Sequence, residues 1–201
     1  MTRSVAILLF EDAEVLDFAG PFEVFLTASR IHRRLFPTSP PPFDVFTIAE
    51  QSGAVATRGR FMVQPHHSFD SHPPIQILIV PGGVVSPQLE DLTLRQWIVG
   101  VSRQAELVAS VCTGSVLLAQ AGLLQGRRAT THWEDAADLQ RDFPDVRVVA
   151  DARWIDEGTI VTAAGISAGL DMSLHLVARF EGEELAMLTA RQMDYRWQRT
   201  P

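Results

Sequence analysis

The chain has a single cysteine, Cys112, among its 201 residues. One cysteine cannot form an intrachain disulfide, and it cannot supply the several thiolates of a multi-cysteine zinc site. A free thiol suits a reducing compartment, so we expect a cytoplasmic protein. Two uses of the residue stay open, either as a small hydrophobic side chain in the core or as a reactive thiol.

The sequence also lacks a surplus of positive charge. It has 17 Lys and Arg against 24 Asp and Glu, which gives a net charge of −7. Proteins that bind nucleic acid normally present a basic stripe, so the composition argues against a nucleic-acid partner. We expect the small clusters around Arg33 and Arg128 to be solvated surface rather than phosphate sites.

Long apolar segments are missing as well. The apolar run near the N-terminus covers only residues 5–10, which is too short for a secretory signal. The uncharged stretch 107–124 reaches the length of a membrane span, but it contains turn-forming and polar residues. We interpret it as a buried strand followed by a buried helix, and we expect no membrane partner.

What the sequence does contain is an alternation of apolar runs with segments of helical periodicity. Apolar runs of this length are typical of parallel strands that are covered on both faces. The expected strands are 4–10, 43–50, 75–80 and 105–112, with hairpins at 53–65 and 146–164. The expected helices are 21–31, 88–104, 114–124, 134–143, 167–180 and 181–194. This order predicts one domain, residues 1–201, of the α/β class with a parallel sheet and helices on both faces.

The carboxyl ends of parallel strands are the usual ligand-binding edge of such a sheet. Three segments are expected there, namely residues 11–17, the turn Pro81–Gly83 and the segment around Cys112. Cys112 lies at a strand-to-helix junction, which is the layout of a nucleophile elbow. The helix N-terminus would lower the pKa of the thiol. A cysteine simply packed at the end of a strand remains the alternative.

Several blocks of sequence, taken together, resemble the ThiJ/PfpI superfamily, a group related to the class I glutamine amidotransferases. The blocks are "LLFEDAEVLDFAGPFEVF", "IVPGG", "SVCTGSVLLAQAGLLQGRRATTHW" and "TAAGISAGLDMSLHLV". They are most similar to the branch that contains isocyanide hydratase and the ligand domains of AraC-type regulators. The resemblance implies a flavodoxin-like α/β sandwich with a nucleophile elbow, and a homodimer.

The resemblance implies that Cys112 is the nucleophile and that Asp17 is the acidic residue that hydrogen-bonds with it. Two neighbouring anions resist joint ionisation, so the pair is expected to share one proton. We expect Asp17 to be neutral and Cys112 to be ionised. From local sequence alone, Asp17 is equally well interpreted as a helix N-cap.

The resemblance extends to four more residues. Thr113 matches the residue whose backbone and hydroxyl face the substrate, and Gly82 and Gly83 match a turn that offers a backbone N–H to developing negative charge. His132 matches a histidine near the cysteine of several relatives, although a packing role suits it equally. Proteases and glyoxalases of the superfamily commonly have histidine where this chain has Thr113, which disfavours both activities.

The resulting hypothesis is a cysteine-dependent hydro-lyase that acts on a small-molecule substrate. It would add water to an isocyanide and release an N-substituted formamide. A non-catalytic ligand-binding protein and a sensor with an oxidisable cysteine are the alternatives. The segment 66–72, "HHSFDSH", has a metal-binding composition without the i, i+4 spacing of helical ligands, so we expect no metal and no cofactor.

Overall fold

The computed structural model describes residues 1–200, and a seven-stranded sheet lies at its centre in the order β10-β11-β7-β6-β1-β2-β5. Every neighbouring pair of strands is parallel except β10 and β11, which are antiparallel. The strands are β1 (Arg3–Leu8), β2 (Phe43–Ala49), β5 (His67–Ser68), β6 (Ile77–Val80), β7 (Leu107–Val111), β10 (Trp154–Asp156) and β11 (Ile160–Ala163).

The central strands are buried along almost their whole length. The side chains of β6 are fully buried, and those of β7 are at most 2% exposed. A strand covered by helices on both faces needs such a continuous apolar run rather than an alternating pattern. The predicted α/β sandwich is therefore confirmed in its central feature, a mostly parallel sheet.

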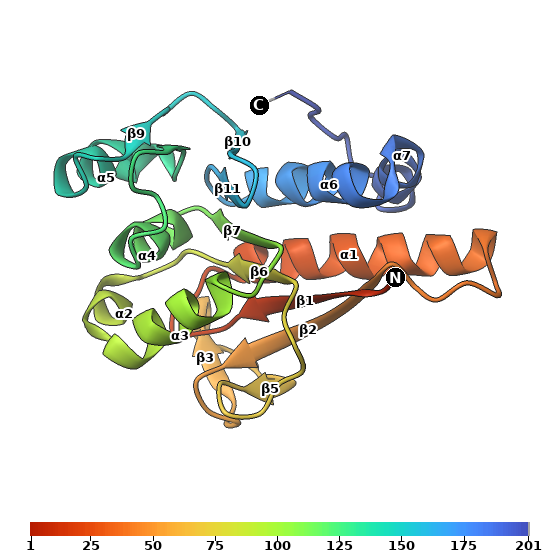
Figure 1. The fold of residues 1–201 in the computed structure, drawn as a ribbon, viewed down its shortest axis with the longest axis horizontal. Coiled ribbons are helices and arrows are strands. Elements are labelled where there is room, and N and C mark those ends of the chain that lie inside the picture. The colour runs from red at the N-terminus through yellow and green to blue at the C-terminus, as the bar shows by residue number, and fades with distance from the viewer. Residues whose placement is uncertain (201) are drawn as a thin grey trace.

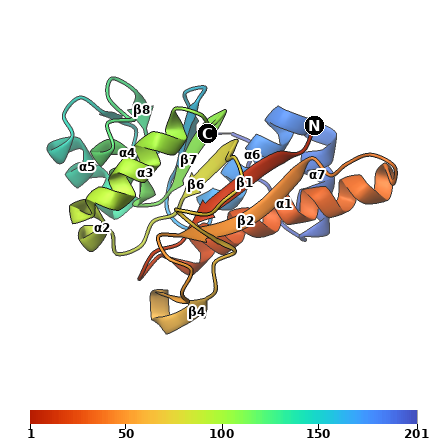
Figure 2. The same cartoon turned by 60° about the horizontal axis from the view of Figure 1, so that its bottom comes forward.

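Helices cover both faces of this sheet (Figures 1 and 2). One face carries α1, α6 and α7, and the other carries α2, α3 and α4. The long helix α1 lies beside α6 in both views, and the two helices are in contact. The helices are α1 (Val15–Leu35), α2 (Ser86–Glu90), α3 (Leu92–Ser102), α4 (Gly114–Gln120), α5 (Ala136–Asp142), α6 (Ala168–Glu181) and α7 (Glu183–Gln192).

Two small sheets lie outside the central one. β3 (Val55–Thr57) and β4 (Phe61–Val63) form the expected antiparallel hairpin, which turns at Gly59 with φ +70°. The expected hairpin over 146–164 is only partly right. β10 and β11 turn at Gly158, but β9 (Arg147–Val148) pairs with β8 (Arg128–Ala129) instead, in parallel.

Three expected helix boundaries were wrong, each for a local reason. The first helix begins at Val15, so Pro21 lies inside it, where it forgoes one backbone hydrogen bond. The expected helix over 88–104 is divided at Asp91, whose extended backbone lets its carboxylate accept the Leu94 N–H and cap α3. α4 ends at Gln120 because the chain turns with a positive φ at Gly122.

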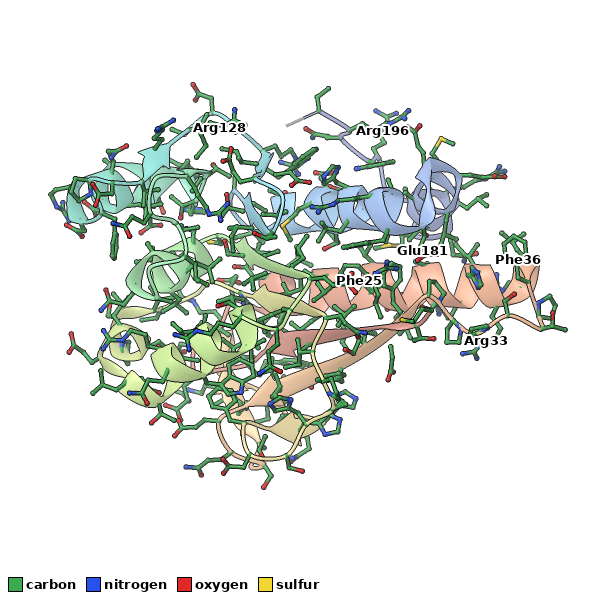
Figure 3. The ribbon with its side chains drawn as sticks, viewed as in Figure 1. Phe25, Arg33, Phe36, Arg128, Glu181 and Arg196 are labelled. Atoms are coloured by element: carbon green, nitrogen blue, oxygen red, sulfur yellow. The ribbon has the colours of Figure 1, made fainter. Side chains whose placement is uncertain are left out.

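The arginine clusters lie far apart on the outside of the molecule. Figure 3 shows Arg33 near the far end of α1 and Arg128 on the opposite side, on β8, and both side chains are exposed. Among residues 1–200, none of the helices combines the length and the hydropathy needed to cross a bilayer.

The homodimer stays a prediction, and the β3–β4 hairpin suggests where to test it. Phe61 and Met62 are 57% and 59% exposed, and burial of one such side chain contributes about 1.5–3 kcal/mol. We expect light scattering at micromolar concentration to give the mass of two chains. The double variant Phe61→Ser, Met62→Ser should dissociate more readily, and a single-chain mass for the unaltered protein would contradict the prediction.

Candidate active site

Cys112 occupies a sharp turn between β7 and α4, where its backbone takes a φ of +57°. This left-handed conformation is uncommon for a residue other than glycine, and it persists only when neighbouring groups hold it. The hydroxyls of Ser115 and Thr131 both donate to the Cys112 carbonyl oxygen at 3.1 Å. The Cys112 N–H donates to the carbonyls of Ala163 and Ala164 at 3.1 and 3.2 Å. The expected nucleophile elbow is therefore present.

Gly114 makes the elbow possible because the chain passes so close to β6. A Cβ at this position would lie 2.2 Å from the Val80 carbonyl oxygen. Any side chain would therefore push α4 away from the sheet. Gly83, with φ +137°, is equally constrained, since a Cβ there would lie 2.3 Å from the Asp12 carbonyl oxygen.

The loops that follow β1 and β6 are hydrogen-bonded to each other. The Glu14 N–H donates to the Gly82 carbonyl at 2.9 Å, and the Val84 N–H donates to the Asp12 carbonyl at 3.2 Å. These bonds fix the start of α1 beside the turn Pro81–Gly83. Segments far apart in the sequence therefore meet at the carboxyl edge of the sheet, as the parallel topology predicts.

Asp17 lies in the first turn of α1 and is fully buried. Glu14 occupies the N-cap position, so the interpretation of Asp17 as an N-cap is excluded. One carboxylate oxygen, Oδ2, accepts the Gly82 N–H at 3.0 Å. The other, Oδ1, is buried without a hydrogen-bond partner. A buried polar atom of this kind is costly unless it carries a proton or meets a ligand.

Burial raises the pKa of the Asp17 carboxyl from 3.8 to about 7. The Gly82 N–H opposes this rise, the negative charge of Glu14 adds to it, and the nearby Cys112 thiol opposes it. Cys112 therefore lies close enough to Asp17 to affect its pKa, and their expected pairing in catalysis stays a prediction. At neutral pH, Asp17 can therefore both take up and release a proton.

Burial also raises the pKa of the Cys112 thiol, to about 12. The residue is 7% exposed, the charges of Asp17 and Asp135 raise the pKa further, and the N–H groups of Thr113 and Ile166 lower it. Burial therefore opposes the expected ionisation of the sulfur, and the N–H groups that favour it do not offset this effect.

The N–H groups of the turn after β6 are already in use. The Gly82 N–H is bonded to Asp17, and the Gly83 N–H donates to Thr113 Oγ1 at 2.9 Å. The Thr113 hydroxyl in turn donates to the Gly83 carbonyl at 3.0 Å. These groups are thus satisfied within the protein, and the expected contacts of Gly82, Gly83 and Thr113 with a substrate stay a prediction. The backbone N–H groups that lower the pKa of the thiol are those of Thr113 and Ile166.

His132 packs against Gly165 beside the site, and it caps a short helix. Its Nδ1 accepts the Glu134 N–H at 3.3 Å, which caps the short 3-10 helix η2 (Trp133–Asp135). A Cβ at Gly165 would lie 2.3 Å from its Cδ2. Within residues 1–200, the imidazole makes no hydrogen bond to Cys112, and its contacts are those of a packing residue.

Sequence reasoning missed three residues that shape the site. The hydroxyls of Ser115 and Thr131 hold the elbow, and Ile166, which has a φ of +44°, has an N–H that lowers the pKa of the Cys112 thiol. Ile166 directly follows the small residues Ala163, Ala164 and Gly165. Nothing in their pattern indicates that a β-branched residue among them would adopt a left-handed conformation.

The histidine-rich segment 66–72 forms no comparable site. Among residues 1–200, no group of three or more His, Cys, Asp or Glu side chains is arranged to hold a metal ion. His66 Nδ1 lies 2.7 Å from the Thr47 hydroxyl, and His72 lies edge-on to Trp97.

Comparisons with known proteins agree with this geometry. A family model described as "DJ-1/PfpI family" matches residues 3–179. An isonitrile hydratase from Pseudomonas putida is 33% identical over 97% of this chain and 79% of its own length. A solved ThiJ/PfpI family protein from Pseudomonas syringae superposes with a TM-score of 0.84, at 25% identity, over 97% of this chain and 76% of that one.

Transcriptional regulators are also similar. The regulator CdhR from Pseudomonas aeruginosa is 29% identical over 96% of this chain. The match covers 55% of the regulator, so this chain spans about half the length of such relatives. The two kinds of relative correspond to the enzyme and binding-protein alternatives that the sequence left open.

The raised pKa of Asp17 makes a prediction about stability. An acid whose folded-state pKa is raised destabilises the fold once it ionises, so stability falls as pH rises from about 4 to about 7 and then levels off. Asp17→Asn keeps an acceptor for Gly82 and removes the charge. We expect the melting temperature of Asp17→Asn to increase relative to that of the wild type as pH rises across this window. Each kcal/mol of difference in stability corresponds to about 2–4 °C.

Thermal unfolding of both proteins between pH 4 and pH 8 measures this difference. Glu14→Gln is the control, since it removes the neighbouring charge on the same helix turn and keeps Asp17. A difference between Asp17→Asn and wild type that stays flat across pH would show that Asp17 has an ordinary pKa.

Proposed function

Because this chain belongs to the DJ-1/PfpI family, we propose that it is a cysteine-dependent enzyme that adds water to an isocyanide. The observation that carries the proposal is the pair formed by Asp17 and Cys112. A buried carboxyl with a pKa near 7 and an unpartnered Oδ1 contacts a buried thiol at the ligand-binding edge of the sheet. Such a pair supplies a nucleophile and a proton carrier to the same atom.

The first step joins sulfur to the terminal carbon of the isocyanide. Asp17, ionised in the singly protonated pair, takes the proton from the Cys112 thiol while the C–S bond forms. The carboxyl then gives this proton to the same carbon. The product is a thioimidate with no net charge, so no ion is left behind in the buried site. The N–H groups of Thr113 and Ile166 stabilise the negative charge that develops on sulfur as its proton departs.

The second step hydrolyses the thioimidate. Water forms the C–O bond and the C–S bond breaks, which yields the N-substituted formamide. One proton of the water ends on nitrogen and the other returns to sulfur. Asp17 is placed to accept a proton from water and to deliver one to Cys112, since it contacts the thiol. The pair is thereby restored to its starting state.

Thr113, the residue after Cys112, favours addition to an isocyanide over acyl transfer such as peptide hydrolysis. Peptide hydrolysis by cysteine usually relies on a paired imidazole that protonates the departing amine. In this chain the residue after Cys112 is Thr113, which is hydrogen-bonded to Gly83, and His132 caps η2. Addition to a carbon–nitrogen multiple bond has no departing amine, so a single carboxyl suffices.

A ligand-binding protein without catalysis is the second candidate, supported by the similarity to the regulator CdhR. The oxidation sensor is less well supported. Reactive sensor cysteines are exposed and have a lowered pKa, whereas Cys112 is buried and its pKa is raised. Turnover of an isocyanide separates the enzyme from both alternatives.

We expect the purified protein to convert an alkyl or aryl isocyanide to the formamide. Cys112→Ser should abolish the reaction, because a buried serine is a far weaker nucleophile. Asp17→Asn should reduce turnover roughly 10²–10⁴-fold, the usual loss for one general acid–base group. Formamide production, followed by chromatography, measures all three proteins.

Alkylation by iodoacetamide is the control for Asp17→Asn. Removing the Asp17 charge lowers the pKa of the thiol, so this variant should be alkylated at least as fast as the wild type. Turnover that survives in Asp17→Asn would remove the carboxyl from the mechanism. An inactive wild type that binds isocyanides reversibly would favour the binding protein.

The rate should also depend on pH in a defined direction. Asp17 must be ionised to accept the thiol proton, and its raised pKa places this ionisation near pH 7. We expect kcat/KM to rise with pH through about 7 and then to remain level. The residual activity of Asp17→Asn should be flat over the same range. A rate that falls as pH rises through 7 would contradict this role.

A further inference from the structure

A second cavity lies at the carboxyl edge of the sheet, between the loops that follow β1 and β2 and the helices α2 and α3. Its volume of about 350 Å³ is within the range of small-molecule sites. The chain runs from β1 to β2 in one direction across the sheet and from β6 to β7 in the other, so the strand order reverses between β1 and β6. Crevices beside such a reversal are the usual ligand sites of open α/β sheets.

The inner surface of this second cavity is apolar. Leu9, directly after β1, and Leu94 of α3 are 1% and 4% exposed, and Phe10 and Phe69 add two phenyl rings. The ring of Phe69 is held by stacking on Trp97, with the two centroids 4.1 Å apart. Such a surface binds an apolar group, and the faces of its aromatic rings attract a cation.

The polar lining of the second cavity is acidic. Glu11 and Glu50 are exposed, and Asp91 is half-buried and uses only Oδ1 to accept the Leu94 N–H at 3.0 Å. Within residues 1–200, none of these three carboxylates is in an ion pair, and no arginine lines the cavity. The cavity therefore attracts a cation and repels an anion.

A polar group without a partner also points to a ligand that donates hydrogen bonds. Gln88 of α2 lines the second cavity, and its Oε1 is buried with no hydrogen-bond partner among residues 1–200. A buried acceptor without a partner is costly, so a donor that lets this flexible side chain turn toward it is favoured. An ammonium group has several N–H donors and no acceptor, which suits both the carboxylates and the amide oxygen.

We propose that the second cavity binds a small protonated amine with an apolar body. The ammonium group lies among Glu11, Glu50 and Asp91 and donates to Gln88, and the apolar body covers the inner surface. Asp17 and Cys112 are not among the lining residues, so this site is separate from the candidate active site and does not depend on the proposed reaction.

The experiment measures binding of phenethylammonium to the full chain by calorimetric titration at low ionic strength. Phenethyl alcohol and phenylacetate are the neutral and anionic comparators. We expect the ammonium to bind more tightly than the alcohol and the alcohol more tightly than the carboxylate. Added salt should reduce these differences, because exposed charges are screened. Failure of the ammonium to bind at millimolar concentration, or an equal affinity for the alcohol, would overturn the proposal.

Two variants locate the bound amine. Ala54 is exposed and lines the second cavity, so Ala54→Trp should fill the cavity without disturbing the core and should abolish binding. Glu50→Gln keeps the shape of an exposed side chain and removes its charge. It should weaken binding of the ammonium roughly two- to fivefold, the effect of one exposed charge pair, and leave binding of the alcohol unchanged.

Glu90→Gln is the matched control, since Glu90 is an exposed carboxylate on the same short helix as Gln88 but does not line the cavity. Its affinity for the ammonium should equal that of the wild type, as should that of Cys112→Ser. Unchanged binding in Ala54→Trp, equal weakening in Glu90→Gln, or loss of binding in Cys112→Ser would overturn the proposal. The probes contain no isocyanide, so a failure of the proposed reaction would leave this result readable.

Discussion

A carboxyl group and a thiol are buried together at the carboxyl edge of the sheet, and the loops around them are held in place by hydrogen bonds that fix both groups. Asp17 is fully buried and Cys112 is 7% exposed, so both depend mainly on backbone groups for their polar contacts. The Gly82 N–H donates a hydrogen bond to the carboxylate, and the N–H groups of Thr113 and Ile166 lower the pKa of the thiol. Burial raises both pKa values, and as a result a single proton can pass between the two groups near neutral pH.

Strain accompanies this arrangement. Asp12, Cys112 and Ile166 all have positive φ values, and each belongs to a segment that borders the pair. Residues in such conformations are held by their neighbours, and they concentrate where a site must present a group in one orientation. Here the turns at Asp12, Cys112 and Ile166 fix the loops that border the pair.

The sequence was sufficient to predict the central strands, the parallel sheet, the elbow at Cys112 and the position of the Asp17 segment at the same edge of the sheet. Apolar runs and the topology of parallel strands carry that information locally. The sequence did not reveal how the backbone donors are shared. Whether the Gly83 N–H is free or bonded to Thr113 depends on the approach of two loops, and the direction of the thiol pKa depends on how deeply α6 and α1 bury the sulfur. Both are tertiary properties that no short motif contains.

The negative charges around the sulfur have an effect on arriving molecules as well as on protons. Asp17 and Asp135 lie close enough to disfavour a negative charge on the sulfur, and Glu14 does the same at Asp17. A carboxylate or phosphate approaching Cys112 would meet the same repulsion, in a setting where little water remains to screen it. An uncharged, slender molecule would enter without that penalty. In the proposed reaction, this repulsion would favour an uncharged substrate over an anionic one before any bond to sulfur forms.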